Sequence, residues 1–200
     1  MIKKILGLVA ILVVLFGVFY VVRTHNNVKN VMKYQQSVKD SLAKQGLQGD
    51  TQLALAIIYT ETKGKVTDVM QSSESLTGKT NDISNKNASI DQGLSNLTTV
   101  LAYANSRGVD DWTGVQAYNF GKAYVDYIAK NGGKTTIQLA KTYSRDVVAP
   151  SLGNTTGAEY YHLTTDSIRY NGGKLYVNGG NMFYADEVRW HMVLLQLFNW

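Results

Sequence analysis

The sequence predicts a mainly α-helical domain with one small β-hairpin, preceded by a single N-terminal transmembrane helix. Three observations support this fold class. An uncharged apolar run opens the chain at residues 5–22, helical spacing of apolar residues recurs through most of the remainder, and Asn-Gly-Gly turn signals stand near the carboxyl end. With 200 residues, 44% of them apolar, the chain can form one domain with a real core and one appendage.

The apolar run at residues 5–22 predicts a membrane anchor. Eighteen helical residues rise roughly 27 Å, close to the thickness of the bilayer hydrocarbon. Lys3 and Lys4 precede the run and Arg23 follows it, so the positive-inside bias places the N-terminus in the cytoplasm and the domain outside. No small-x-small cleavage site precedes Arg23, but a secretory signal removed at an unobvious site is the alternative. In either case we expect the domain to be extracytoplasmic.

Two helices are expected after the anchor. Residues 28–42 repeat apolar side chains at helical spacing, and Gly46 ends that pattern. Asp50 is placed to cap a second helix that runs to about Thr62, and the apolar composition of this helix predicts that it is buried. Residues 66–89 are polar and irregular, which indicates a loop.

The strongest amphipathic pattern of the chain follows this loop. Ser89 and Gln92 form a capping box, and apolar residues then recur at spacings of three and four until Gly108. Asp111 is expected to cap a short helix that ends near residue 120, and a further helix is expected over residues 122–130.

The last third of the chain changes character. Thr135 or Thr136 is expected to cap a helix that ends before Pro150. Residues 167–170 and 174–177 flank Asn171-Gly172-Gly173, which predicts a β-hairpin, and residues 182–200 return to a helical pattern. We therefore divide the chain into an anchor or signal at 1–23, a juxtamembrane helix at 24–49 and a domain at 50–200.

Composition excludes several classes of protein. The chain has no cysteine, so it has no disulfide scaffold and no cysteine-zinc site. Its three histidines lie far apart in the sequence and form no zinc motif, and we expect neither a metal nor a cofactor. With Lys3, Lys4 and Arg23 set aside, 17 of the 20 basic residues remain against 15 acidic ones. A net charge of +2 is too small to indicate nucleic-acid binding, whereas a mild basic excess suits an anionic cell wall.

Glu61 is the most informative carboxylate. It falls in the last turn of the buried helix expected after Asp50, where the helix dipole disfavours a negative charge. Partial burial would also raise its pKa, and both effects favour the protonated form that a general acid needs. A solvated side chain at a frayed helix end is the alternative that position alone leaves open.

Three segments carry a resemblance to a known superfamily. They read ETKGKVTDVMQSSES at residues 61–75, GVQAYNFG at 114–121 and NMFYADEV at 181–188. In order and approximate spacing they resemble the motifs of the lytic transglycosylase and goose-type lysozyme superfamily. The resemblance is to its Gram-positive lysozyme-like branch, which includes the muramidase domains of conjugative-element cell-wall hydrolases and the pneumococcal vaccine antigen A-like proteins. It covers roughly residues 28–188 and implies a lysozyme-like helical domain.

The resemblance implies a site centred on Glu61. Glu61 matches the catalytic acid, and Thr62 replaces the usual serine after it. Tyr184 matches a late tyrosine that hydrogen-bonds the acid. Asp68, Met70, Gln71, Ser73, Tyr118 and Asn119 are the candidate substrate-binding residues. For Met70 a place in the core, and for Ser73 a plain loop position, are the alternatives.

The implied reaction is cleavage of peptidoglycan at the β-1,4 bond after N-acetylmuramic acid. A lysozyme needs a second carboxylate, roughly 5 Å from the first for a nucleophile or 6.5–9.5 Å for a base that holds water. Glu74 is the first candidate and Asp68 the second, whereas a lytic transglycosylase needs neither. Candidate aromatic walls for sugar subsites are Tyr103, Tyr124, Tyr160, Tyr161, Tyr170 and Tyr176.

Two functions other than catalysis stay open at this point. One is an inactive lysozyme-like protein that binds peptidoglycan or acts as a scaffold. The other is an anchored module of a division or secretion complex, which would use an exposed apolar face at residues 28–42. The expected location is the same for each function: a single membrane pass with the domain on the outer side of a Gram-positive envelope, or secretion if the N-terminal segment is cleaved.

Overall fold

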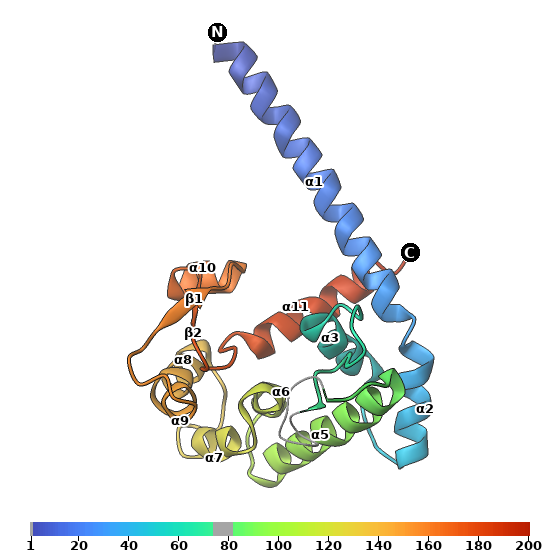
Figure 1. Ribbon diagram of the computed structural model, residues 1–200, viewed down its shortest axis with the longest axis vertical. Coiled ribbons are helices and arrows are strands. Elements are labelled where there is room, and N and C mark those ends of the chain that lie inside the picture. The colour runs from blue at the N-terminus through green and yellow to red at the C-terminus, as the bar shows by residue number, and fades with distance from the viewer. Residues whose placement is uncertain (1, 74–81) are drawn as a thin grey trace.

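The computed structural model describes residues 2–73 and 82–200, and within them the chain is mainly helical (Figure 1). The elements are α1 (Ile2–Met32), α2 (Gln35–Gln45), α3 (Thr51–Glu61), α5 (Lys86–Ser106), α6 (Asp111–Phe120), α7 (Ala123–Ala129), α8 (Ile137–Tyr143), the π-helical turn η1 (Ser144–Val148), α9 (Ala149–Ser151), β1 (Glu159–Tyr161), α10 (Thr165–Asn171), β2 (Lys174–Tyr176) and α11 (Tyr184–Leu197). The mainly α fold with a two-stranded antiparallel sheet and a long apolar N-terminal helix confirms the expected fold class.

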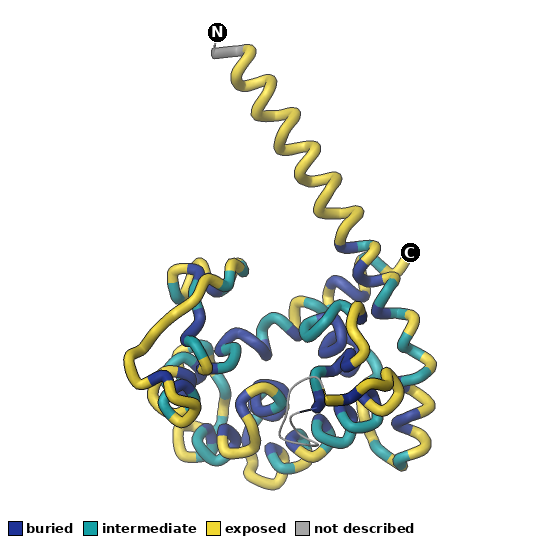
Figure 2. The backbone as a smooth tube through the Cα atoms, in the orientation of Figure 1, coloured by how far each residue is buried: buried dark blue, intermediate teal, exposed yellow. Residues whose placement is uncertain are grey.

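Helix α1 joins the apolar run to the domain without a break. Residues 4–23 project from the molecule and are exposed, whereas Thr24, Asn27 and Val28 are at most 5% exposed (Figure 2). By length and composition α1 can cross a membrane. The expected exposed apolar face at residues 28–42 is wrong, because Val28, Val31 and Val38 are completely buried in the same core as α3.

Two hydrophobic clusters build the domain. The first joins α1, α2, α3 and the start of α5 to α11, and the second joins α6, α7, α8 and β2. Phe183 belongs to the second cluster and Tyr184, its neighbour in the chain, belongs to the first. The start of α11 is therefore fixed from both sides, which gives Tyr184 a rigid position between the two cores.

The β-hairpin differs from the expected one. Residues 174–176 form a strand as expected, but their partner is β1, with Glu159 opposite Tyr176 and Tyr161 opposite Lys174. The expected first arm, residues 167–170, lies in α10. Thr164 and Ser167 form a capping box that starts this helix, and Gly172, with φ of 60°, ends it in the left-handed conformation. The Asn-Gly-Gly signal at 171–173 thus ends a helix.

Other boundaries also differ from the sequence-based expectations. The helix expected over residues 28–42 is divided between α1 and α2 by a turn at residues 33–34, and Asp111, the expected cap, is the first residue of α6. Asn85 caps α5, because its side chain accepts from the N–H groups of Asn87 and Ala88, so the helix begins one turn before the expected Ser89. Helical structure also continues through Pro150. The π-helical turn η1 ends at Val148, and Pro150 lies in the first turn of α9, where the missing N–H of the proline breaks no hydrogen bond within that helix.

Candidate active site

Glu61 is the last residue of α3, and the chain beyond it is held firmly. Asp50 caps the start of α3 by accepting from Gln52 N at 2.7 Å. At the other end, the Thr62 hydroxyl donates to the carbonyl of Val69 at 2.8 Å. From α1, Asn30 donates to the Lys63 carbonyl at 2.6 Å. The helix end at Glu61 is therefore anchored to two other segments and is not frayed, although the helix carries no basic residue in its last turn.

The Glu61 carboxyl is directly contacted by Tyr184. The Tyr184 hydroxyl donates to Glu61 Oε1 at 2.6 Å, across 123 residues of sequence. Burial raises the pKa of Glu61 to about 7, although this hydrogen bond acts in the opposite direction, and the negative charges of Asp68 and Glu187 raise it further. A carboxyl with this pKa holds its proton in a large fraction of molecules near neutral pH.

Tyr184 is itself supported by a second tyrosine. The rings of Tyr118 and Tyr184 stack with centroids 6.2 Å apart, and the Tyr118 hydroxyl donates to the Met70 carbonyl at 2.9 Å. Tyr118 comes from α6, Tyr184 from α11, Glu61 from α3 and Met70 from the loop after α3. The fold thus brings four of the expected site residues into one connected group.

Asp68 organises the loop that carries Met70. Its carboxylate accepts from the N–H groups of Ser72 and Ser73 at 3.0 and 3.1 Å, and from the hydroxyls of Ser73 and Ser89 at 2.5 and 2.6 Å. Burial raises the pKa of Asp68, but these hydrogen bonds together outweigh burial and leave the pKa lowered. Asp68 is 3% exposed and is a stable anion whose lone pairs are already used.

The other expected substrate-binding residues divide by exposure. Met70 is fully buried against Gly93, where an added Cβ would lie 2.7 Å from Met70 Cβ, and Ser73 is 1% exposed. Gln71 is half-buried and has φ of 47°, a backbone conformation unusual for a residue with a side chain. Asn119 is exposed and accepts from Asn181 N at 2.7 Å. Glu74 lies outside the described residues.

A buried glutamine joins two of the sequence motifs, and sequence reasoning missed it. Gln116 is 1% exposed, donates to the Asn181 carbonyl at 2.8 Å and accepts from Ala185 N at 3.1 Å. These contacts tie α6 to the first turn of α11, next to Tyr184. The sequence did contain a pointer to this contact, since Gln116 lies in the motif at 114–121 and Asn181 in the motif at 181–188. Neither residue has a local structural role that would have identified it.

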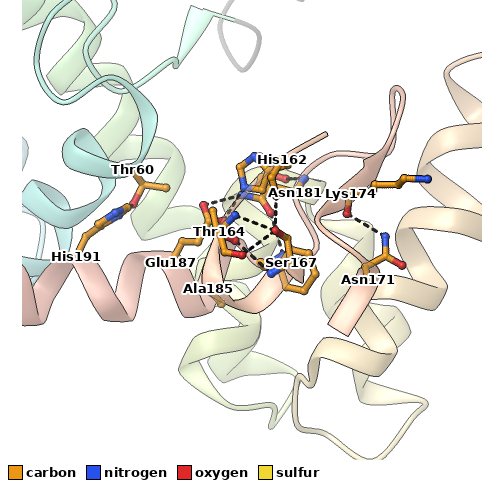
Figure 3. A network of polar contacts seen from close by, with 12 residues as sticks. Thr60, His162, Thr164, Ser167, Asn171, Lys174, Asn181, Ala185, Glu187 and His191 are labelled. Carbon is orange, nitrogen blue, oxygen red and sulfur yellow. Dashed lines mark hydrogen bonds and ion pairs between the residues drawn. The ribbon is translucent and has the colours of Figure 1, made fainter. Parts of the chain in front are cut away.

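A second carboxylate, Glu187, lies on α11 within one turn of Tyr184. Its Oε1 contacts His162 Nε2 at 2.7 Å, and its Oε2 accepts from Asn181 Nδ2 at 2.9 Å (Figure 3). Glu187 and His162 line a cavity of about 600 Å³ together with Lys63 and His191. Burial lowers the pKa of His191 to about 4, so this ring is neutral at pH 7. The His162–Glu187 contact connects the segment after β1 to α11.

The tyrosines proposed as subsite walls have different environments. Tyr124 and Tyr176 are buried in the second cluster, and the Tyr103 hydroxyl donates to Asp126 at 2.9 Å. Tyr161 and two others on the β1 and α10 segment, Tyr160 and Tyr170, are exposed. Within residues 2–73 and 82–200, no cluster of three histidine or acidic side chains is arranged to hold a metal ion.

The chain resembles known proteins over most of its length. The model of the lysozyme-like family matches residues 28–192. Pneumococcal vaccine antigen A of Streptococcus pneumoniae is 49% identical over 99% of this chain and 97% of its own length. The bifunctional muramidase/DL-endopeptidase CwlT of Bacillus subtilis is 37% identical over 55% of this chain and 33% of its own. A crystal structure of a Staphylococcus aureus protein similar to a lipoprotein of the NLP/P60 family superposes with a TM-score of 0.72. It is 30% identical and covers 82% of this chain and 52% of that one. The resemblance inferred from the motifs is confirmed.

Proposed function

The chain belongs to the lysozyme-like family, and from that premise we propose that it cleaves the glycan strands of peptidoglycan. The bond cleaved is the β-1,4 bond between N-acetylmuramic acid and N-acetylglucosamine, and Glu61 is the general acid. The muramidase activity in the name of the Bacillus subtilis relative supports this reaction class.

The observation that carries the proposal is the state of the Glu61 carboxyl. Departure of the sugar oxygen needs a proton as positive charge develops at the anomeric carbon. Burial gives Glu61 a pKa of about 7, and the Tyr184 hydrogen bond at 2.6 Å fixes the direction of the side chain. A positioned acid of this kind typically accelerates a reaction by a factor on the order of 10² to 10⁴.

Asp68 is better suited to support the acid than to act as a base. Its oxygens already accept hydrogen bonds from three serines, and its pKa is lowered, so it is a poor acceptor for a proton from water. Its negative charge raises the pKa of Glu61. In this proposal Asp68 holds the loop that contains Gln71 and keeps Glu61 protonated, while Gln71, Tyr118 and Asn119 contact the glycan.

The location proposed for this activity is the outer face of the cell membrane. Helix α1 is long and apolar enough to span the bilayer, and Lys3 and Lys4 precede its apolar run. The positive-inside bias then favours an outer location for Thr24 and the residues that follow it. The cell wall of a Gram-positive envelope lies on that side.

The test is digestion of purified peptidoglycan by the full chain and by Glu61→Gln, followed by mass spectrometry of the soluble products. We expect the wild-type protein to release fragments that end in muramic acid and the variant to release none. Reducing ends would identify a muramidase and 1,6-anhydro ends a lytic transglycosylase. Binding of peptidoglycan by the wild-type protein without any release would instead identify an inactive wall-binding protein.

A further inference from the structure

We propose that one face of the domain lies against the outer leaflet of the membrane, so that the domain is held in a fixed orientation on the bilayer. This inference rests on the membrane anchoring in the proposed function, and it adds a second contact with the lipid. The contact surface, here called the membrane-side patch, consists of exposed apolar residues on two segments. They are Tyr161, Leu163 and Ile168 on the β1–α10 segment, and Trp190, Val193 and Leu197 on α11.

The exit of the anchor from the domain leaves no room for a flexible linker. The apolar run ends at Val22, and Thr24, two residues later in the same helix, is already 3% exposed in the body of the domain. At the C-terminus, His25 Nδ1 contacts the Phe198 carbonyl at 3.1 Å, and the His25 and Trp200 rings stack with centroids 4.2 Å apart. A helix clamped in this way places the adjoining surface of the domain at the level of the lipid headgroups.

The patch lies on the side from which the anchor emerges. One cavity is lined at once by Tyr20 of the apolar run, by Leu163 and by Trp190, so both parts of the patch face the anchor. Val193 and Leu197 follow Trp190 at spacings of three and four and continue its stripe along α11. In Figure 1, β1 and α10 also extend toward the side from which α1 projects.

The chemistry of the patch fits a lipid interface. Its six residues are between 38% and 75% exposed, although they are apolar or aromatic, and a neighbouring tryptophan, Trp200, is 76% exposed. Large apolar patches are unusual on a surface that faces only water. Tryptophan and tyrosine are enriched where membrane proteins meet the headgroup region. Because the anchor already brings this face to the bilayer, the lipid surface is the occupant that requires no other partner.

Spin-label accessibility tests the inference directly, because the chain contains no cysteine and each introduced one is unique. Ile168→Cys and Leu197→Cys report on the two parts of the patch. Ala102→Cys is the matched control, since Ala102 is exposed and belongs to α5, a helix that lies away from the exit of α1 (Figure 1). Leu12→Cys reports on the anchor. Each nitroxide-labelled full chain is reconstituted in vesicles of phosphatidylglycerol and phosphatidylethanolamine.

We expect the spin labels at residues 168 and 197 to be several-fold less accessible to a water-soluble nickel chelate than the label at residue 102. We also expect them to be more accessible to oxygen, which partitions into the lipid. Accessibility at 168 and 197 equal to that at 102, with residue 12 inside the bilayer, would overturn the patch and leave the anchor and the proposed catalysis intact. A water-accessible label at residue 12 would overturn both membrane contacts. Spectral broadening at residue 168 that disappears on dilution with unlabelled chain would assign the patch to a second copy and also reject the inference.

Discussion

Replacing Tyr184 by phenylalanine should move the pH dependence of cleavage upward. The Tyr184 hydroxyl donates to Glu61 Oε1 at 2.6 Å and lowers the pKa of Glu61 against the larger effect of burial. A hydrogen bond to a charged group contributes about 1.5–3 kcal/mol. One pKa unit corresponds to about 1.4 kcal/mol, and a water molecule can replace part of the lost contact, so we expect the pKa of Glu61 to rise by about one unit.

The assay is the pH profile of kcat/KM for solubilisation of purified peptidoglycan. A general acid loses activity as pH rises through its pKa, so the alkaline limb should lie near pH 7 for the wild-type protein and about one unit higher for Tyr184→Phe. An alkaline limb that stays in place or moves to lower pH would show that the Tyr184 hydroxyl does not stabilise the Glu61 carboxylate.

Tyr124→Phe is the matched control for this change. Tyr124 is fully buried in the second cluster, and its hydroxyl lies 2.6 Å from Thr135 Oγ1. The substitution removes the same atom from a tyrosine that has no contact with Glu61. We expect a small loss of stability and an unchanged alkaline limb, so that a shift specific to Tyr184 separates the electrostatic effect from general loosening of the fold.

Three further substitutions have outcomes that the structure determines. Glu61→Gln should stabilise the fold at pH 8 by about 1–2 kcal/mol, because ionising a half-buried carboxyl of raised pKa costs free energy. The difference in stability should vanish below pH 4.5, where the carboxyl is protonated in both the folded and the unfolded state. Urea unfolding at both pH values measures this difference, and equal stability of the two proteins at pH 8 would contradict the prediction. Asp68→Asn should lower stability at pH 7 by about 2–4 kcal/mol. Because the pKa of Asp68 is lowered in the folded state, this contribution is present above about pH 4 and is lost as pH falls below that value. The free energies of unfolding of the wild type and the variant should therefore converge in acid, and a difference that stays constant with pH would argue against this role of Asp68. Gly93→Ala should cost about 1–3 kcal/mol, since the added Cβ meets Met70 Cβ at 2.7 Å, and an unchanged melting temperature would oppose this packing.

The long helices could be predicted because their signals are local and repeated. The apolar stripe of α5 extends over many turns, so its helical state was clear even though the cap at Asn85 was missed. The prediction of the β-hairpin failed because its signals are short. Each strand has three residues, and those of β1 are exposed without alternation, so no period was available to identify it. Asn171-Gly172-Gly173 serves equally well as a hairpin turn or a helix end.

The site was only partly predictable, because its contacts join distant segments. The position of Glu61 at a helix end was a local inference, and the raised pKa agrees with the reasoning from burial. The partner, Tyr184, came from the family motif, since nothing local indicates a contact across 123 residues. Gln116 and the His162–Glu187 pair were missed because their roles exist only in the tertiary structure.

Residues 28–42 show a second limit of prediction from sequence, because what covers an apolar surface depends on the tertiary structure. The apolar residues were expected on one helix and lie on two, α1 and α2. The sequence does not say whether such residues meet solvent, a partner or the rest of the chain. In the structure α3 and α11 cover them, and Leu194 and Leu195 of the C-terminal helix belong to the same cluster. At the apolar carboxyl end of the chain, Leu194 and Leu195 thus pack on the domain, whereas Val193 and Leu197 of the same helix stay exposed.

Whether Glu61 donates the proton is measured most directly by the yield of soluble muropeptides from purified peptidoglycan, compared between the wild-type protein and Glu61→Gln at pH 6. We expect fragments with muramic acid termini from the wild type and none above background from the variant, although both retain the same helical circular dichroism. Equal release by the two proteins would contradict the assignment of the proton donor to Glu61.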